Sequence, residues 1–302
     1  MQSQFSQRKE KEVISPEQIN EYHENGYLVV SNVFSGAECD EVLRRIRPYA
    51  NKDFAAIMNP DRPEYLLAQF TKCRYAMKDE SDGNRIGEFV DKISIVLKNS
   101  SDSSMMAGIL GLNVSELETA LDSSAFLRER VMRDPKTADI LETLQKREVV
   151  ALMSQMLFKE AGTRYANQAW RPHQDNSYPQ NQNAQYITTN LFLADADREN
   201  GTLYIYPESH KLGLLKSDKT LSYREAKTNP GNKTMMPAEW EDRHVDVNFK
   251  KGDLLVLHGN CIHGSYPNSS SRSRPLYSCS LISEGEYFYP GPHARRMEIP
   301  LR

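Results

Sequence analysis

Residues 171–180 read RPHQDNSYPQ and place His173 and Asp175 two positions apart, shortly after a run, ALMSQMLFKEAG, that is typical of a strand. Side chains at positions i and i+2 of a strand point to the same face. An imidazole and a carboxylate at this spacing can therefore converge on one metal ion. The pair by itself is equally compatible with a polar turn, where isolated polar residues are common.

A third ligand decides between these two interpretations. Two of the seven histidines, His258 and His263, follow a predicted core strand in KKGDLLVLHGNCIHGSYPNSSSRSRP, residues 250–275. Two histidines and one carboxylate form a facial triad that suits iron(II) and leaves three coordination positions open. Zinc would more often recruit cysteine or a third histidine. The residues alone leave open which of the two histidines completes the set.

Arg274 lies eleven residues after His263, at the start of the segment RPLYSCSLI. At this position its side chain is expected to point into a barrel interior next to the metal. A buried guanidinium needs an anionic partner, and its fixed fork of donors matches a carboxylate. The sequence reserves no obvious acidic side chain for it.

The two halves of the chain differ in pattern. Ser15 with Gln18, and Ser35 with Glu38, have the spacing of capping boxes and predict two helices around the strand YLVVSNVF. Residues 84–147 are mainly helical in period, whereas short strand-like segments separated by turns follow residue 150. This predicts an antiparallel sandwich or barrel. We expect one domain over 1–302, with a helical flank carrying the first strand (1–150), a β core (151–290) and a tail (291–302).

Composition excludes several classes of protein. The formal charge is -3, with 38 basic and 41 acidic side chains and no long run of either sign, which argues against nucleic-acid and membrane-surface binding. Neither a signal peptide nor a long apolar run is visible, so a cytoplasmic protein is expected. The four cysteines lack CxxC spacing, which argues against a zinc ribbon or a disulfide framework. The aromatic tail could mediate dimerisation, and we expect a monomer or a homodimer.

The motifs HQD and IHGSYPNSSSRSR closely resemble those of the phytanoyl-CoA dioxygenase family of iron(II)/2-oxoglutarate oxygenases, which includes ectoine hydroxylase. SPEQINEYHENGYLVVSNVFSGAEC resembles the entry helix and first strand of that family, and ENGTLYIYPESHK resembles its central hairpin. The likeness touches nearly the whole chain and is weakest around residues 50–150. Glu208 departs from the pattern, because the hairpin usually has glycine there.

The resemblance implies a double-stranded β-helix of jelly-roll or cupin-like form, with N-terminal and inserted helices. It implies that His173, Asp175 and His263 hold the metal and act as the catalytic group, which leaves His258 a structural role. It further implies that Arg274 binds the distal carboxylate of 2-oxoglutarate with Ser265 as a second contact. The implied cofactors are Fe(II), 2-oxoglutarate and O2, with ascorbate as a reductant.

The ligand set also bears on the reaction. Halogenating relatives replace the carboxylate ligand with a small residue, so the presence of Asp175 favours hydroxylation, desaturation or ring closure of a small-molecule substrate. Asn190 is expected to contact 2-oxoglutarate or substrate, and Arg171 an acidic group of the substrate. Residues 214–244 have the composition of a lid. The alternatives are a cupin-like metal enzyme independent of 2-oxoglutarate and a catalytically silent small-molecule-binding module.

Overall fold

The computed structural model describes residues 13–50, 115, 122, 126–162, 164–218, 232–289 and 298–302. Its first helix is α1 (Pro16–Asn25). The Gln18 backbone N–H donates to Ser15 Oγ at 3.3 Å, and the Ser15 N–H donates to Gln18 Oε1 at 2.9 Å. Gly26 ends the helix with a φ of 80°, which glycine adopts without the strain that a β-carbon would impose. The predicted capping box is confirmed.

The second predicted helix is also present, as α2 (Gly36–Ala50). The Ser35 N–H donates to Glu38 Oε2 at 2.7 Å, and the Glu38 N–H donates to Ser35 Oγ at 3.3 Å. Further along, a π-helix, η2 (Arg128–Met132), precedes α7 (Pro135–Gln145). Most of the segment 84–147, predicted to be helical, lies outside the described residues.

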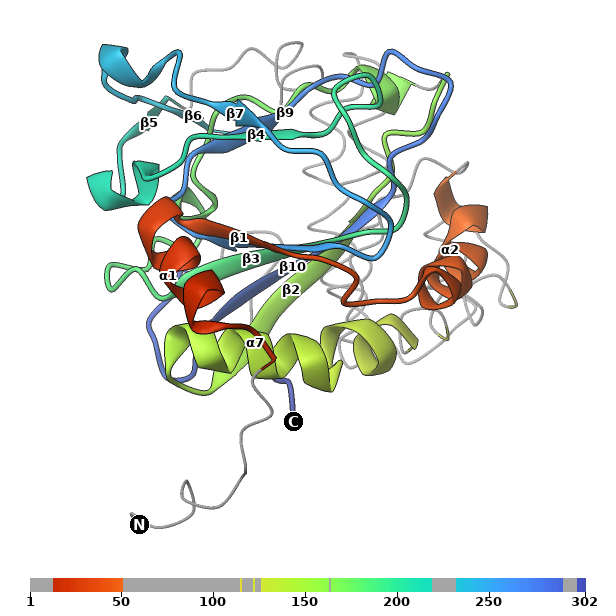
Figure 1. Cartoon of the computed structure of the whole chain (residues 1–302), viewed down its shortest axis with the longest axis horizontal. Helices are drawn as coiled ribbons and strands as arrows, with labels where there is room; N and C mark the ends of the chain where they lie inside the picture. The colour runs from red at the N-terminus through yellow and green to blue at the C-terminus, as the bar shows by residue number, and fades with distance from the viewer. Residues whose placement is uncertain are drawn as a thin grey trace, which may run out of the picture.

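Two antiparallel sheets form the body of the protein and face one another (Figure 1). The larger sheet has the order β1-β8-β3-β10-β2-β11, with β1 (Tyr27–Val30), β2 (Val149–Leu157), β3 (Tyr186–Phe192), β8 (Leu254–His258), β10 (Leu276–Ser283) and β11 (Ile299–Pro300). The smaller sheet has the order β7-β4-β9, with β4 (Leu203–Ile205), β7 (Val245–Asp246) and β9 (His263–Ser265). A separate hairpin pairs β5 (Ser217–Asp218) with β6 (Lys233–Thr234). Short 3-10 helices in the connections are η3 (Arg164–Asn167), η4 (Asp175–Ser177), η5 (Ser209–Leu212) and η6 (Ala238–Trp240).

Alternation along the strands separates the two faces of the larger sheet. On β10, Tyr277 and Leu281 belong to the core cluster that includes residues of α1 and α7, on the outer face. Leu276 belongs instead to a second cluster, which it shares with Ile205 of the smaller sheet. Figure 1 shows α7 beneath the larger sheet, on the side away from the smaller sheet. We therefore call the side of each sheet that borders the space between the sheets its inner face. The side of the larger sheet that the helices cover is its outer face.

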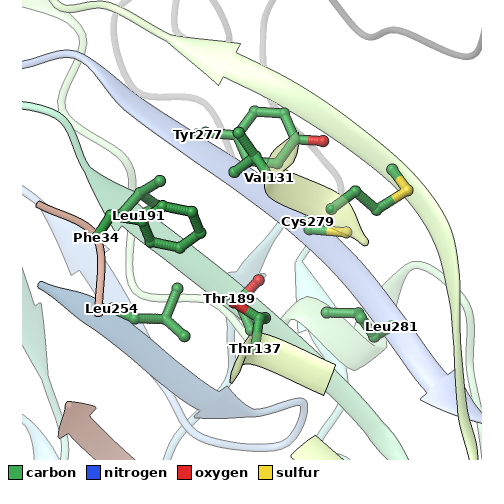
Figure 2. Close-up of a pocket in the computed structure, with 10 residues that line it drawn as sticks. Phe34, Val131, Thr137, Thr189, Leu191, Leu254, Tyr277, Cys279 and Leu281 are labelled. Atoms are coloured by element: carbon green, nitrogen blue, oxygen red, sulfur yellow. The ribbon is translucent and has the colours of Figure 1, made fainter. Parts of the chain in front are cut away.

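A small cavity lies on the outer face, between this face and the segment around α7 (Figure 2). Its lining is mostly apolar, and Thr137, Thr189 and Tyr277 are the residues in it with hydroxyl groups. Thr189 and Tyr277 are outer-face positions of β3 and β10. The cavity is thus separated by the larger sheet from anything that the inner face holds, and it is a packing void of the outer core. Among the described helices, none combines the length and apolar character needed to span a membrane.

Candidate active site

His173 and His263 are brought together by the backbone. The His173 N–H donates to the His263 carbonyl at 2.9 Å, and the His263 N–H donates to the His173 carbonyl at 3.0 Å. This isolated antiparallel bridge joins the HQD segment to β9, and β9 is held in turn by β4, where Ile205 pairs with His263. Residues 90 positions apart in the chain are thereby fixed side by side.

Asp175 reaches the same point by a different route from the one that strand alternation predicted. It opens the 3-10 helix η4 rather than continuing a strand. The Asn176 N–H donates to the Gly259 carbonyl at 2.9 Å and fixes this turn against the end of β8. The strand interpretation of the HxD pair was therefore wrong, although the pair does converge, because a bridge followed by a tight turn carries the carboxylate toward the imidazoles.

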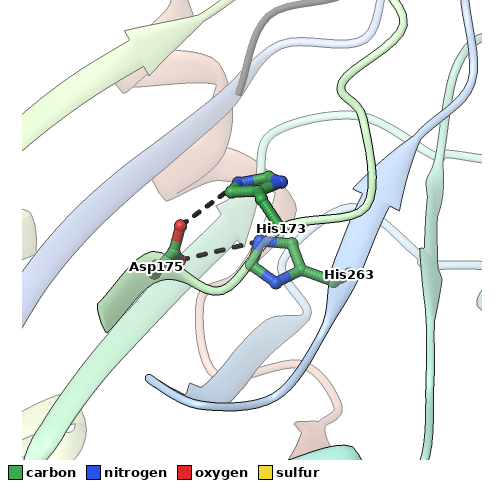
Figure 3. A group of neighbouring side chains, drawn as sticks. All are labelled: His173, Asp175 and His263. Carbon is green, nitrogen blue, oxygen red and sulfur yellow. Dashed lines mark ion pairs between the residues drawn. The ribbon is translucent and has the colours of Figure 1, made fainter. Parts of the chain in front are cut away.

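The three side chains form a compact group (Figure 3). Asp175 Oδ1 lies 3.3 Å from His173 Nε2, and Asp175 Oδ2 lies 3.6 Å from His263 Nε2. One ligand atom from each residue lies within 4.8 Å of the others, and this is the one His/Cys/Asp/Glu group of metal-binding size among the described residues. The donor set, two imidazole nitrogens and one carboxylate, fits a first-row divalent metal.

Backbone carbonyls orient both rings. His173 Nδ1 lies 2.7 Å from the Arg171 carbonyl, and His263 Nδ1 lies 3.1 Å from the Cys261 carbonyl. A carbonyl oxygen can only accept, so each Nδ1 carries the proton and each Nε2 keeps its lone pair for a metal. These contacts give both imidazoles the tautomer that a metal ligand requires.

Burial and neighbouring charges set the protonation states of the metal-binding group. His173 and His263 are 4% and 6% exposed. Burial lowers the pKa of His263, which keeps that ring neutral near pH 7. Burial alone would raise the pKa of the Asp175 carboxyl, but the adjacent His263 and His173 rings hold that pKa well below its usual range. A neutral imidazole and an ionised carboxylate are the protonation states that bind metal.

Gln174, the middle residue of the HQD motif, is fully buried and was not identified from the sequence. Its Nε2 donates to the carbonyls of Gly213 and Asn260, both at 2.7 Å, and its Oε1 accepts from the Leu215 N–H at 2.8 Å. This side chain therefore ties the ligand segment to the chain just before β5 and to the loop after β8. The signal available in the sequence was an amide side chain placed between the two predicted ligands His173 and Asp175.

Arg274 and Ser265, predicted to bind 2-oxoglutarate, are both buried, at 2% and 4% exposure. Arg274 Nε donates to the Gly201 carbonyl at 3.1 Å, and Ser265 Oγ accepts from Lys159 Nζ at 2.7 Å. Ser265 lies two residues from His263 on β9 and thus shares its inner face. Arg272, two residues before Arg274 in the sequence, is a surface residue whose Nη2 pairs with Asp197 at 2.7 Å.

Two further predicted residues lie near the group. Asn190 is buried on β3 and shares its face with Phe192, which packs between the two sheets, so Asn190 belongs to the inner face. Arg171 is half-buried, and its carbonyl is the acceptor for His173 Nδ1. The roles of Asn190 toward the cofactor and of Arg171 toward substrate stay predictions.

His258 ends β8 and lies apart from the metal-binding group. Its ring packs against His210 at 5.0 Å and Tyr22 at 6.4 Å between centroids, and its Nδ1 accepts from the Asn260 N–H at 3.0 Å. Burial lowers the pKa of His258 to about 4. These contacts support the structural role that was expected for it.

The segment 214–244, expected to form a lid, is described only in part, because residues 219–231 lie outside the described residues. Its described parts are attached to the ligand segment. The Thr234 N–H donates to the Pro172 carbonyl at 2.8 Å, and the Asn232 N–H donates to the Tyr178 hydroxyl at 3.2 Å. The base of this segment therefore lies beside His173, and its action as a lid stays a prediction.

Comparison with known proteins gives a consistent result. The family model for phytanoyl-CoA dioxygenase (PhyH) matches residues 22–276. Phytanoyl-CoA dioxygenase domain-containing protein 1 of Danio rerio is 26% identical over 290 residues, covering 92% of this chain and 94% of its own length. Phytanoyl-CoA dioxygenase of Arabidopsis thaliana is 25% identical over 303 residues, covering 95% of both chains.

Solved structures share the fold at lower identity. The epimerase SnoN in complex with Fe3+, alpha ketoglutarate and nogalamycin RO has a TM-score of 0.60 at 16% identity and covers 95% of this chain and 94% of its own. EctD from S. alaskensis with 2-oxoglutarate and 5-hydroxyectoine has a TM-score of 0.58 at 16% identity and covers 98% and 88%. The predicted double-stranded β-helix, mainly β with flanking helices, is confirmed.

Fold and site together define an oxygenase of the iron(II)/2-oxoglutarate-dependent class. Within that class, the chain belongs to the phytanoyl-CoA dioxygenase family. The resemblance inferred from the HQD and IHGSYPNSSSRSR motifs is thereby confirmed.

Proposed function

We propose that this protein is an Fe(II)/2-oxoglutarate-dependent dioxygenase that hydroxylates an unactivated C–H bond of a small molecule and releases succinate and CO2. The observation that carries the proposal is the buried group of His173, Asp175 and His263, with both Nε2 lone pairs and the carboxylate directed to one point. Bound iron(II) and 2-oxoglutarate supply the activation of O2 for the oxidation of the substrate.

The protein's own groups position these reactants. His173, Asp175 and His263 would hold the metal, and three protein ligands would leave coordination positions free for 2-oxoglutarate and O2. The bonds from Nδ1 to the Arg171 and Cys261 carbonyls hold the two rings in orientation. The burial of the two histidines would limit access of water to a bound metal.

Arg274 and Ser265 are the proposed partners of the distal carboxylate of 2-oxoglutarate. Both residues are buried, and both lie beside Lys159, which bonds Ser265 Oγ and the Gly201 carbonyl that Arg274 Nε also contacts. Ser265 lies two residues from His263 on β9. The guanidinium offers a fixed fork of donors that a carboxylate accepts. Asn190, on the inner face of β3, is proposed to contact 2-oxoglutarate or the substrate.

The kind of oxidation and the substrate are the finer part of the proposal. Named relatives and neighbours include a phytanoyl-CoA dioxygenase, an epimerase and a carbocyclase. We propose hydroxylation here, because Asp175 retains the carboxylate ligand. Arg171 is the proposed contact for an acidic group of the substrate, and Arg171→Ala should weaken substrate affinity while leaving 2-oxoglutarate affinity unchanged. A monomer or homodimer in the cytoplasm is the expected state.

The test is an anaerobic titration of the protein with iron(II) and then with 2-oxoglutarate. We expect the weak visible absorption band of the chelate in the wild type, none in Asp175→Ala, and an unchanged band in the matched variant His258→Ala. Succinate release is then measured with a panel of small molecules. Iron binding without a band would instead support a cupin-like metal enzyme independent of 2-oxoglutarate, and a band without succinate from any substrate would support a silent binding module.

A further inference from the structure

Lys159 is a fully buried lysine, with 1% of its surface exposed, that follows β2. Its backbone lies in the left-handed region, with a φ of 38°, which costs a residue with a β-carbon free energy. Its carbonyl is fixed by Asn268 Nδ2 at 2.9 Å. Both the burial and the backbone conformation are unusual for lysine, which normally keeps its ammonium group in water.

The ammonium group of Lys159 has three acceptors. It donates to Ser265 Oγ at 2.7 Å, to the Gly201 carbonyl at 3.4 Å and to the Tyr266 carbonyl. A lysine has three N–H donors, so all of them are used. None of these three acceptors is a carboxylate. Among the residues that the structure describes, the hydrogen bonds of Lys159 therefore provide no compensating anion.

Arg274 places a second cation beside the first. Its Nε donates to the same Gly201 carbonyl at 3.1 Å that Lys159 contacts, and both residues are buried. Burial, together with the charge of Arg274, lowers the pKa of Lys159 well below its ordinary value. A bound anion would relieve the desolvation of Lys159 and its repulsion by Arg274, and would thereby favour the charged ammonium form of Lys159.

In the hydrogen bond between Lys159 and Ser265, the lysine is the donor and the serine hydroxyl is the acceptor. Because Nζ donates to Oγ, the hydroxyl proton of Ser265 is left to be donated elsewhere. Ser265 lies on the inner face with His263. An anion bound by this hydroxyl and by Arg274 would therefore belong to a molecule that reaches toward the metal-binding group.

We propose that Lys159 is a positioning residue for the distal carboxylate of a dicarboxylic 2-oxo acid, which it serves by holding Ser265 as a donor and by adding a second positive charge. This inference rests on the proposed function, because it takes 2-oxoglutarate as that acid. It assigns Lys159 to cofactor discrimination, a task that would otherwise fall to Arg274 and Ser265 alone.

The experiment compares two ligands that share the chelating end. 2-Oxoglutarate carries the distal carboxylate, and 2-oxopentanoate has a methyl group in its place. Dissociation constants for both are measured anaerobically from the visible band of the iron(II) protein, in the wild type, in Lys159→Met and in the matched surface variant Lys250→Met, whose lysine side chain is 81% exposed. Thermal unfolding shows whether each variant is folded.

For Lys159→Met we expect the dissociation constant of 2-oxoglutarate to rise about tenfold or more, with that of 2-oxopentanoate nearly unchanged. Lys250→Met should behave as the wild type with both ligands. Equal weakening of the two ligands, or no weakening of either, would show that Lys159 has only a structural role and would overturn the inference.

Two further measurements keep the test decisive. If Lys159→Met does not fold, Ser265→Ala is measured with the same ligands, and an unchanged preference for 2-oxoglutarate would overturn the inference. Where both variants fold, the double variant should lose little more than the larger single loss, because the two residues act together. A wild type that binds iron but shows no band with 2-oxoglutarate would overturn the proposed function itself, which separates the two failures.

Discussion

Inner and outer positions differ sharply in chemistry even where they are close neighbours in the chain. His263 belongs to the metal-binding group, whereas His258, five residues earlier, packs against His210 and Tyr22. Arg274 is buried near Ser265, whereas Arg272, two residues earlier, forms a surface ion pair with Asp197. Residue type therefore does not determine function here. What matters is where the fold places the side chain, between the sheets, on the outer face or at the surface, and which groups lie beside it.

The largest expected effect tests the two histidine positions against one another. Asp175→Ala and His263→Ala should each reduce succinate formation by about a thousandfold or more, because the metal loses one of three protein ligands. His258→Ala should retain turnover and iron. Iron content and succinate release are measured for all three variants, and loss of iron from His258→Ala equal to that from His263→Ala would contradict the assignment.

The two arginines provide the next comparison. Arg274→Ala removes a charge-assisted pairing of about 1.5 to 3 kcal/mol and should weaken 2-oxoglutarate binding by about ten- to a hundredfold. Arg272→Ala should have little effect, because its partner Asp197 lies at the surface. Dissociation constants from the chelate band are the measurement. A larger loss in Arg272→Ala would reverse the two roles.

His258, the outer histidine, should affect the pH dependence of stability rather than the iron content of the protein. The pKa of His258 is lowered from 6.5 to about 4, so the folded protein favours the neutral ring. Its contribution to stability is complete above pH 6.5 and is lost as the pH falls from 6.5 toward 4, because the unfolded chain takes up the proton first. The loss amounts to no more than about 3 kcal/mol.

Urea unfolding of the metal-free protein at pH 7.5 and at pH 5 measures this loss. His258→Gln should show a shallower decline in the free energy of unfolding between the two pH values than the wild type does. Identical declines in both proteins would exclude His258 as a source of acid sensitivity.

A smaller effect is expected from Gln174, whose amide supports the segment that carries His173 and Asp175. Gln174→Met removes the amide that bonds Gly213, Leu215 and Asn260, and it should weaken iron binding by about tenfold. Gln182→Met, at an exposed position nearby, is the matched control. Iron dissociation constants decide the point, and equal values for the two variants would limit Gln174 to a role in folding.

Local patterns in the sequence predicted the local structure well. Ser15 and Gln18 cap the first helix as expected, because a capping box involves residues only three positions apart. The strand-like segments after residue 150 became the strands of the two sheets. The reason given for the HxD pair was wrong, because the bridge from His173 to His263 and the turn at Asp175 depend on β9 and β8.

The sequence by itself determined the helix caps, the strand-rich second half, the family and the identity of the predicted ligands, since each depends on short motifs that can be read along the chain. Only the tertiary structure decided which carbonyls orient His173 and His263, that Gln174 joins three backbone segments, and that Lys159 lies beside Arg274 and Ser265. Those contacts join residues 39 to more than 100 positions apart or depend on a local turn. Their geometry follows from how the two sheets pack, which no spacing along the chain encodes.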